Sequence, residues 1–268
     1  RRRDDDGLID KQLLMERIAE EDISAALVVH LYGSMVHPET IKNAMSLDKF
    51  VIEDCAQAFG SRSGKEFAGA IGHLGAHSFY PTKNLSTIGD GGGVSIGKTS
   101  DFSPNHIREI AEYGWDSNKE VVHVGLNSRL DELHAMFLLS GLDELEKQTK
   151  EKQKLAGEYL DALLSKTSVS AVLNKHQLDE ICPHLFVIRC KEPQKIDELA
   201  YKYNISLGRH YPKALPDHTY FSSFEVVTQK NKSLVGRKIA TDGRSLPFFV
   251  GMTEAERTSV LEFLGAIE

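Results

Sequence analysis

Two short apolar runs in this chain each lead into side chains that could do chemistry. Phe50–Ile52 is followed by Asp54, and Leu74–His77 is followed by Ser78 and Lys83. Both runs have the composition of strands buried on both faces, as in a parallel sheet. Ligands collect just outside the carboxyl ends of such strands. We therefore expect a carboxylate, a hydroxyl and a lysine to converge on one pocket.

A lysine beside a carboxylate at such a pocket suggests chemistry on a carbonyl group. An amine attacks a carbonyl only when it is neutral, so burial would have to lower the pKa of Lys83 from its usual ~10.4. Pyridoxal phosphate (PLP) is the cofactor best served by this pair, because Asp54 could keep its pyridine nitrogen protonated. Spacing alone leaves open the commoner alternative, in which Lys83 is a surface lysine and Asp54 caps a loop.

Composition limits the classes of protein to which the chain could belong. Its 268 residues, 41% hydrophobic and 26% charged, predict a globular protein of one large or two moderate domains. A net charge of −7 gives no support for nucleic-acid binding, and the sequence has no apolar run near the ~18 residues of a membrane span. Three cysteines without metal-ligand spacing favour a reducing, cytoplasmic setting. Cys55 is either a reactive thiol or a small buried apolar residue.

The first half of the chain alternates predicted strands and helices, which favours right-handed parallel crossovers. The predicted elements are a helix over Ile9–Glu20, a strand over Ala25–Leu31, a short helix from Pro38, a strand over Phe50–Glu53, a glycine-rich loop over Gly60–Gly75, a strand over Val94–Ile96, a helix over Phe102–Tyr113 and a long helical region from Asn127 to about Lys166.

The last third mixes strands and helices differently. We predict a strand over His184–Cys190, a helix over Ile196–Tyr203 that Asn204 ends in the left-handed conformation, a strand over Ile205–Tyr211, and a final helix opened by the capping box Thr253–Glu256. The predicted fold class is α/β with a mainly parallel central sheet flanked by helices. A large domain would occupy residues 1–145, and residues 146–268 would form a long linking helix and a small α+β domain.

Several linked motifs resemble one known family, in the family's order along most of the chain. They lie at His30–Gly33, Val51–Gly60, Ser78–Leu85, Gly89–Gly92, Gly125–Leu133 and, more weakly, His210–Pro212. These segments resemble the nucleotide-sugar aminotransferases of the DegT/StrS family, which have the aspartate-aminotransferase fold (PLP fold type I). The resemblance implies transfer of an amino group, most often from glutamate, to a nucleotide-linked keto-sugar.

The resemblance also implies roles for the matching residues. Lys83 would form a Schiff base with PLP and act as the catalytic proton shuttle, while Asp54 would pair with the pyridine nitrogen. Gln57 would bind near the ring's 3-oxygen and Ser78 would bind the phosphate. Asn127 would reach the phosphate of a neighbouring subunit, because the family's active sites lie at a homodimer interface.

Four further residues are candidates for the substrate site, each with an equally simple structural role. Tyr80 could line the sugar site or only pack, and Arg129 could pair with a substrate phosphate or with nearby carboxylates. His210 and Tyr211 lie where the family's small domain approaches the substrate. No metal is expected, because five scattered histidines share no metal-type spacing: His73, His77, His106, His123 and His134.

The chain departs from the family pattern at its start. Family members normally begin with a strand, a helix whose amino end binds the cofactor phosphate, and an aromatic residue that stacks on the ring, and this chain lacks that segment. We expect a fragment of a longer protein, because Asp54, Gln57, Ser78, Lys83 and Asn127 are all retained. Two rivals stay open. One is a sugar dehydratase of the same fold, which the lysine at position 83 disfavours, and the other is an inactive protein with a binding or regulatory role.

Overall fold

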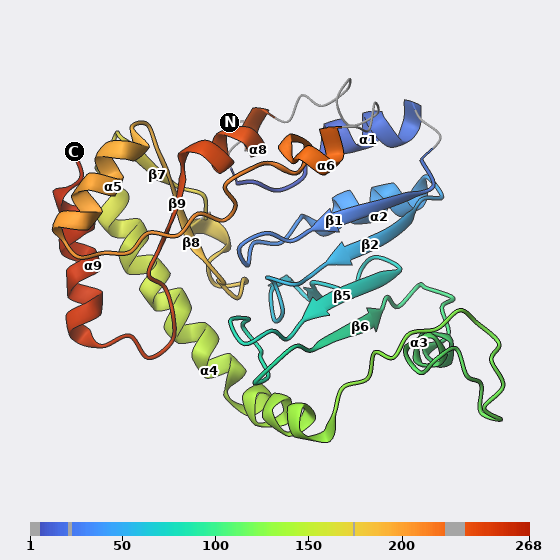
Figure 1. Ribbon diagram of the computed structural model, residues 1–268. Coiled ribbons are helices and arrows are strands. Elements are labelled where there is room, and N and C mark those ends of the chain that lie inside the picture. Colours follow the sequence, from blue (N-terminus) through green and yellow to red (C-terminus); the bar gives the residue numbers. More distant parts are fainter. Residues whose placement is uncertain (1–5, 21–22, 174, 223–233) are drawn as a thin grey trace. The chain divides into compact units, whose positions relative to one another are not determined.

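The computed structural model describes residues 6–20, 23–173, 175–222 and 234–268, in two compact units (Figure 1). One unit consists of residues 9–147, and the other consists of residues 148–268 together with the described residues 6–8. The boundary between the units lies between residues 147 and 148, whereas the sequence predicted domains over residues 1–145 and 146–268. In the described part of the chain, no helix combines the length and the apolar character needed to cross a membrane.

A four-stranded sheet forms the centre of the first unit. Its strands, in spatial order, are β1 (Ala25–Val29), β2 (Phe50–Asp54), β5 (Leu74–Ser78) and β6 (Gly92–Ile96). The first three strands are parallel and β6 is antiparallel to β5. In this register Val29 pairs with Asp54 and Asp54 pairs with Ala76, so the carboxyl ends of the three parallel strands lie at one edge of the sheet. The predicted mainly parallel sheet is confirmed.

Helices cover one face of this sheet. α1 (Lys11–Glu20) and α2 (Pro38–Ser46) contact each other, and α2 lies alongside β1 and β2 in Figure 1. Burial on both faces was expected for the runs that form β2 and β5, and it is wrong in part, because alternate residues of β2 are only half-buried and Ala76 of β5 is exposed. In β1 burial also alternates, and Leu27 is 60% exposed. The reason is that the described chain packs helices against only one face of that strand, so alternate side chains stay in contact with solvent.

The connections of the first unit differ from prediction at two places. The glycine-rich loop contains a small antiparallel hairpin, β3 (Arg62–Ser63) and β4 (Glu66–Phe67). After α3 (Pro104–Ala111), the long helix α4 (Glu132–Leu163) begins later than the predicted Asn127. Asp131 is the reason, because its side chain accepts the His134 N–H at 2.9 Å and so starts the helix.

The second unit contains a small antiparallel sheet in the order β7 (Val169–Ala171), β8 (Phe186–Cys190) and β9 (Gly243–Leu246). Its helices, in addition to the second half of α4, are α5 (Pro193–Lys202), α6 (Thr219–Ser222), α8 (Leu234–Asp242), α9 (Glu254–Ala266) and two 3₁₀ turns at Lys175–Gln177 and Leu215–Asp217. Tyr159, Phe186 and Phe263 are among the fully buried residues of its core. The predicted α+β character of this part is confirmed.

Two local predictions for this unit are confirmed and one is wrong. Asn204 ends α5 with a φ of 55°, and Thr253 opens α9 with the predicted capping box. The predicted strand over residues 205–211 does not form. The backbone of this segment forms an isolated bridge to β9, between Gly208 and Ser245.

Candidate active site

Asp54 ends the central strand of the parallel set and is held by both neighbouring strands. Its carbonyl oxygen accepts the His30 N–H at 3.0 Å, and the next residue, Cys55, donates its N–H to Ala76 at 2.8 Å. The half-buried carboxylate accepts the Ala56 N–H at 3.0 Å. These bonds fix the backbone on both sides of the carboxylate at the end of the strand.

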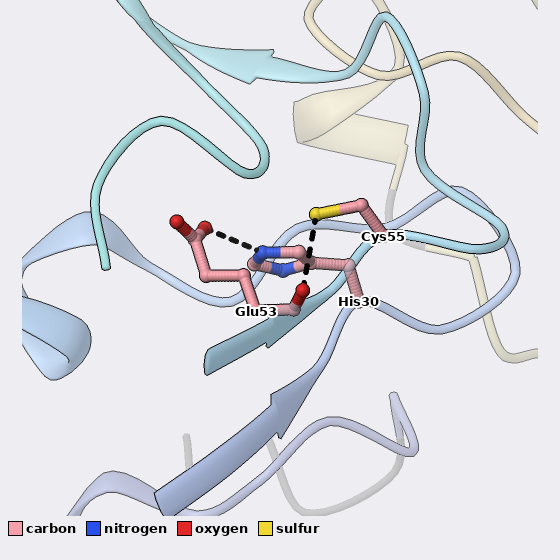
Figure 2. Close-up of side chains that lie close together, drawn as sticks. All are labelled: His30, Glu53 and Cys55. Carbon is pink, nitrogen blue, oxygen red and sulfur yellow. Dashed lines mark hydrogen bonds and ion pairs between the residues drawn. The ribbon is translucent and has the colours of Figure 1, made fainter. Parts of the chain in front are cut away.

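Directly before Asp54 in the chain lies a buried carboxylate that sequence analysis missed. Figure 2 shows Glu53 against the ring of His30, whose Nε2 lies 2.8 Å from Glu53 Oε2. The same carboxylate accepts backbone N–H groups from Gly69 at 3.0 Å, Ile71 at 2.8 Å and Gly72 at 2.7 Å. Both side chains are fully buried. Because successive side chains of a strand point to opposite faces, this network anchors β2 on the face away from Asp54.

The electrostatics of Glu53 match this anchoring role. Burial acts to raise the pKa of the carboxyl group, but the bonds from His30 and from the backbone of Gly72 and Gly69 outweigh burial and leave the pKa below its ordinary value. Glu53 is therefore an ionised group stabilised by a ring of donors. A sequence signal did exist, since Glu53 stands at a core-facing position of an otherwise apolar strand.

Cys55 also lies beside this network. Its thiol is buried and lies 3.7 Å from the backbone oxygen of Glu53, as Figure 2 shows. Burial raises the pKa of the thiol far above its usual value, and the charges of Glu53 and Asp54 raise it further. A thiol in that state is a poor nucleophile, which favours the buried apolar role over the reactive one.

Gln57 is buried just beyond the end of β2. Its amide oxygen accepts the Tyr32 N–H at 2.8 Å. Tyr32 and Gly33 have φ values of 58° and 98°, so this bond supports a tight turn after β1. The contact joins the loops that follow β1 and β2 at the same edge of the sheet.

Lys83 lies on the loop that follows β5. The hydroxyl of Ser78, the last residue of that strand, accepts the Tyr80 N–H at 3.4 Å. Lys83 donates its N–H to the Tyr80 carbonyl at 2.8 Å. The loop is held at Phe79, which donates to Gly91 and accepts from Thr87, both at 2.8 Å. The segment from Ser78 to Lys83 is thus fixed by short backbone bonds.

The structure brings Lys83 and Asp54 into one electrostatic environment. Burial lowers the pKa of the half-buried Lys83 amine below its usual value, while the charge of Asp54 acts in the opposite direction. Such an amine is neutral more often than an exposed lysine, and a carboxylate close enough to affect its charge stands at the next strand end. The lowered pKa of Lys83 has the direction that attack on a carbonyl requires, and the roles of Lys83 and Asp54 stay predictions.

Asn127 and Arg129 lie in a different part of the first unit, on the segment between α3 and α4. Asn127 is exposed and forms a bridge with Glu112 beside the end of α3. The guanidinium of Arg129 lies 6.0 Å from the centre of the Tyr113 ring, a cation–π contact. Asn127 is therefore presented on an exposed surface of this unit.

The remaining candidates are divided between the two units. Tyr80 is 49% exposed on the Lys83 loop. His210 and Tyr211 belong to the second unit, where His210 Nδ1 lies 2.8 Å from Ser245 Oγ and the two rings make an edge contact. The structure thus gives His210 a structural partner on β9.

Comparison with known proteins identifies the family. The model of the DegT/DnrJ/EryC1/StrS aminotransferase family matches residues 3–265. The chain belongs to this family. The resemblance predicted from the motifs is confirmed, as is the fold class, because solved aminotransferases of this family superimpose closely.

Three relatives illustrate the similarity. A dTDP-3-amino-3,4,6-trideoxy-alpha-D-glucose transaminase of Micromonospora megalomicea subsp. nigra is 30% identical, with 97% of this chain and 70% of the relative aligned. A "Pleiotropic regulatory protein" of Geobacillus stearothermophilus is 31% identical over 92% of this chain and 66% of its own length. The crystal structure of S. venezuelae DesV, in complex with a ketimine intermediate, is 26% identical with a TM-score of 0.85, over 96% of this chain and 68% of that one. The chain spans between 51% and 70% of the length of the curated relatives it matches.

Proposed function

We propose that the protein transfers an amino group, with PLP as cofactor, to the keto group of a nucleotide-linked deoxysugar. The observation that carries this proposal is the placement of Lys83 and Asp54 in one electrostatic environment, at the carboxyl edge of a parallel sheet, in a chain of an aminotransferase family. Relatives named as transaminases of dTDP- and UDP-linked sugars support the substrate class.

The residues at this edge fit the cofactor. PLP carries a pyridine nitrogen, an aldehyde and a phosphate, and when bound it withdraws electrons from the carbon that loses a proton. Asp54 would face the ring nitrogen and keep it protonated, since its backbone is held by both neighbouring strands. Ser78 would donate its hydroxyl to the phosphate. Gln57 would donate its amide N–H to the ring's 3-oxygen, because its amide oxygen already accepts the Tyr32 N–H.

Lys83 would act as both nucleophile and base through its Nζ atom. A base must be able to lose and regain a proton near neutral pH. Burial lowers the pKa of the amine and favours its neutral form. The charge of Asp54 acts against this effect, so the amine can still hold a proton. One lysine would then serve both halves of the reaction, first with the amino donor, which we propose is glutamate, and then with the sugar.

Asn127 would complete the site of a second copy of the chain. The segment around it exposes large apolar side chains, including Val124 at 96% and Leu126 at 65%, and the start of α4 exposes Met136 and Leu139. Large apolar side chains exposed in this number favour an interface with another chain. We therefore propose a homodimer in which each chain presents Asn127 to the partner's cofactor phosphate. Tyr80, Arg129, His210 and Tyr211 would contact the sugar nucleotide.

A regulatory role is the second candidate, supported by the relative named a pleiotropic regulatory protein. A dehydratase of the same fold is a weaker alternative, because a lysine occupies position 83. Each of these two alternatives predicts a different experimental result from that of a transaminase. A purely regulatory protein would not consume an amino donor, and a dehydratase would change the sugar without incorporating nitrogen.

The test uses the full-length protein purified with PLP. We expect a visible absorption band that glutamate removes, and incorporation of ¹⁵N from labelled glutamate into one member of a panel of nucleotide-linked keto-sugars. Borohydride reduction followed by peptide mass measurement should place the cofactor on Lys83. Lys83→Ala should abolish both signals, whereas Lys119→Ala, a change at an exposed lysine of the same unit, should leave them intact. Turnover by Lys83→Ala would overturn the mechanism, and a stable cofactor complex that no amino donor alters would favour the regulatory candidate.

A further inference from the structure

Three metal-ligating side chains converge in the first unit, away from the strand ends. His106 and Glu109 are on α3, and His123 is on the segment that follows it. The Nε2 atom of His123 lies 3.1 Å from His106 Nδ1 and 3.1 Å from Glu109 Oε2. All three ligand atoms lie within 4.8 Å of one another, and the side chains are half-buried, so solvent can reach them.

Local structure holds the three residues in place. Residues 106 and 109 are separated by three positions, so they share one face of the helix. His123 is positioned by a close backbone crossing, in which His123 and Val122 both donate their N–H groups to the Gly114 carbonyl, at 3.2 and 2.8 Å. A side chain at Gly114 would put its Cβ 1.9 Å from the His123 oxygen. The crossing therefore depends on glycine and fixes the distance between His123 and α3.

The cluster has fewer N–H hydrogens than it has close donor–acceptor contacts. An ionised carboxylate can only accept, so Nε2 of His123 must carry the hydrogen that points to Glu109. Nδ1 of His106 lies equally close to that same nitrogen, and it must then accept as well. One hydrogen shared between two acceptors gives each of them a bent, weak bond. A cation at the same place would receive a lone pair from all three atoms at once.

We propose that His106, Glu109 and His123 bind a divalent first-row transition ion, with Zn²⁺ as the best match. Two imidazoles and a carboxylate are a donor set that zinc accepts, with a water molecule as fourth ligand. Ligand atoms about 2.1 Å from zinc at tetrahedral angles lie about 3.4 Å apart, and the two imidazole nitrogens are already 3.1 Å apart. Binding needs the two imidazole rings and the Glu109 carboxylate to turn toward the ion, and the His123 hydrogen to shift from Nε2 to Nδ1.

The other three-residue group that could hold a metal, among the described residues, is different in kind. It consists of His30, Glu53 and Cys55. There the carboxylate already accepts three backbone N–H groups and the imidazole, and the thiol pKa is strongly raised. A metal would have to displace these bonds in a fully buried site. That group therefore carries no metal proposal, whereas the α3 cluster is half-buried and its three ligand atoms lie within 4.8 Å of one another.

A bound ion would tie the α3–α4 segment to α3. His123 precedes Asn127 by four residues, and Leu126 and Ser128 on either side of Asn127 donate their N–H groups to Ile110 and Ala111 of α3. The ion would thus order the exposed segment that presents Asn127, without touching the reacting groups. This inference departs from the sequence expectation of no metal, because 17 positions separate His106 from His123 and only the folded segment brings them together.

The test is calorimetric titration of ZnCl₂ into the full-length protein after treatment with a chelator and dialysis. We expect one ion per chain. His123→Ala should weaken binding at least tenfold, since it removes a direct ligand. Glu109→Gln, which keeps the size of the side chain, should also weaken it. His218→Ala, at an exposed histidine of the second unit, should bind zinc as the unchanged protein does.

Two further readouts make the outcome decisive. Co²⁺ in place of zinc should give the strong visible absorption of a tetrahedral nitrogen–oxygen site, and zinc should slow proteolytic cleavage within residues 114–125. Absence of binding, or equal affinity in the unchanged protein, His123→Ala and Glu109→Gln, would overturn the proposal. None of these measurements depends on aminotransferase activity, so the metal site can fail while the proposed function stands.

Discussion

Glu53 is the buried charge that holds the strand end beneath Asp54. Its carboxylate accepts from His30 and from three backbone N–H groups. In Glu53→Gln, the new NH₂ group would face donors, so at least one buried donor would lose its acceptor. We expect a loss of roughly 3 kcal/mol in the free energy of unfolding, measured by urea titration at pH 7. Glu112→Gln, at an exposed glutamate of the same unit, should change it by less than about 0.5 kcal/mol.

The same residue makes a prediction about pH. The pKa of Glu53 in the folded protein lies below its ordinary value of 4.5. Its contribution to stability is therefore present above pH ~4.5 and is lost as the pH falls through the folded-state pKa. The difference in stability between the unchanged protein and Glu53→Gln should shrink as the pH is lowered through this range. A difference that stays constant from pH 7 to the acid limit would contradict the assignment of an ionised Glu53.

Lys83 allows a direct test of its coupling to Asp54. The charge of Asp54 raises the pKa of the amine against the lowering effect of burial. Asp54→Asn removes that charge, so the pKa of Lys83 should fall further and the amine should react at lower pH. The measurement is the pH dependence of acylation at Lys83 in the cofactor-free protein, followed by mass spectrometry. Asp90→Asn, at an exposed aspartate of the same unit, should leave the midpoint in place. An unchanged midpoint in Asp54→Asn would remove the basis for pairing these residues.

Sequence reasoning located Asp54 and Lys83 because the end of a buried strand is visible as a change from apolar to polar residues. It did not locate Glu53, whose partners are backbone groups of a loop 16 to 19 residues away. Its one sequence signal is a charged residue at a core-facing position of an apolar run, and no spacing reveals the partners of its carboxylate. Likewise, the contact between His210 and Ser245 joins positions 35 residues apart.

At the scale of elements, the role of Gly114 in the backbone crossing after α3 can be tested by comparing it with Gly64, a control glycine between β3 and β4. Gly114 and Gly64 both have positive φ, at 75° and 61°. A Cβ at Gly114 would lie 1.9 Å from the His123 oxygen, whereas a Cβ at Gly64 would meet nothing within 4 Å. Gly64→Ala should cost about 1 kcal/mol from backbone strain alone. Gly114→Ala should cost clearly more, because the segment that carries His123 must move.

The measurement is thermal unfolding together with limited proteolysis. Gly114→Ala should open residues 115–125 to cleavage under conditions in which Gly64→Ala remains intact. Equal stability and equal cleavage of the two variants would show that the crossing is not a constraint on this segment. The pair separates steric conflict from the conformational cost that both substitutions share.

Elements were predictable where hydrophobic pattern and caps agree, and not where a tertiary contact overrides the pattern. Apolar runs predicted β1, β2 and β5, and a capping box predicted the start of α9. β9 was missed because its sequence Gly243-Arg244-Ser245-Leu246 looks exposed. Arg244 is buried there since Asp197 accepts both Nε and Nη2 of its guanidinium at 2.6 and 2.7 Å. Only the fold shows that pairing.

At the scale of the whole molecule, the proposed homodimer depends on the apolar surface that begins near Asn127. Met136 and Leu139 on α4 are 67% and 65% exposed. Burying such side chains stabilises an interface by roughly 1.5–3 kcal/mol each. A charge at either position would have to be desolvated on association, so Met136→Glu and Leu139→Glu should each shift the protein toward monomer. Size-exclusion chromatography with light scattering, over a range of concentrations, measures the dimer fraction directly.

The control for this prediction is Leu215→Glu, because Leu215 is similarly exposed, at 67%, but lies in a 3₁₀ turn of the second unit. The Leu215→Glu variant should keep the dimer fraction of the unchanged protein. If the α4 variants are monomeric, Asn127 can no longer reach a partner, so their affinity for PLP should fall together with the dimer fraction and recover at high protein concentration. Monomeric variants with unchanged cofactor affinity would show that Asn127 does not serve a neighbouring chain. A protein that is dimeric in all three variants would place the interface on another surface.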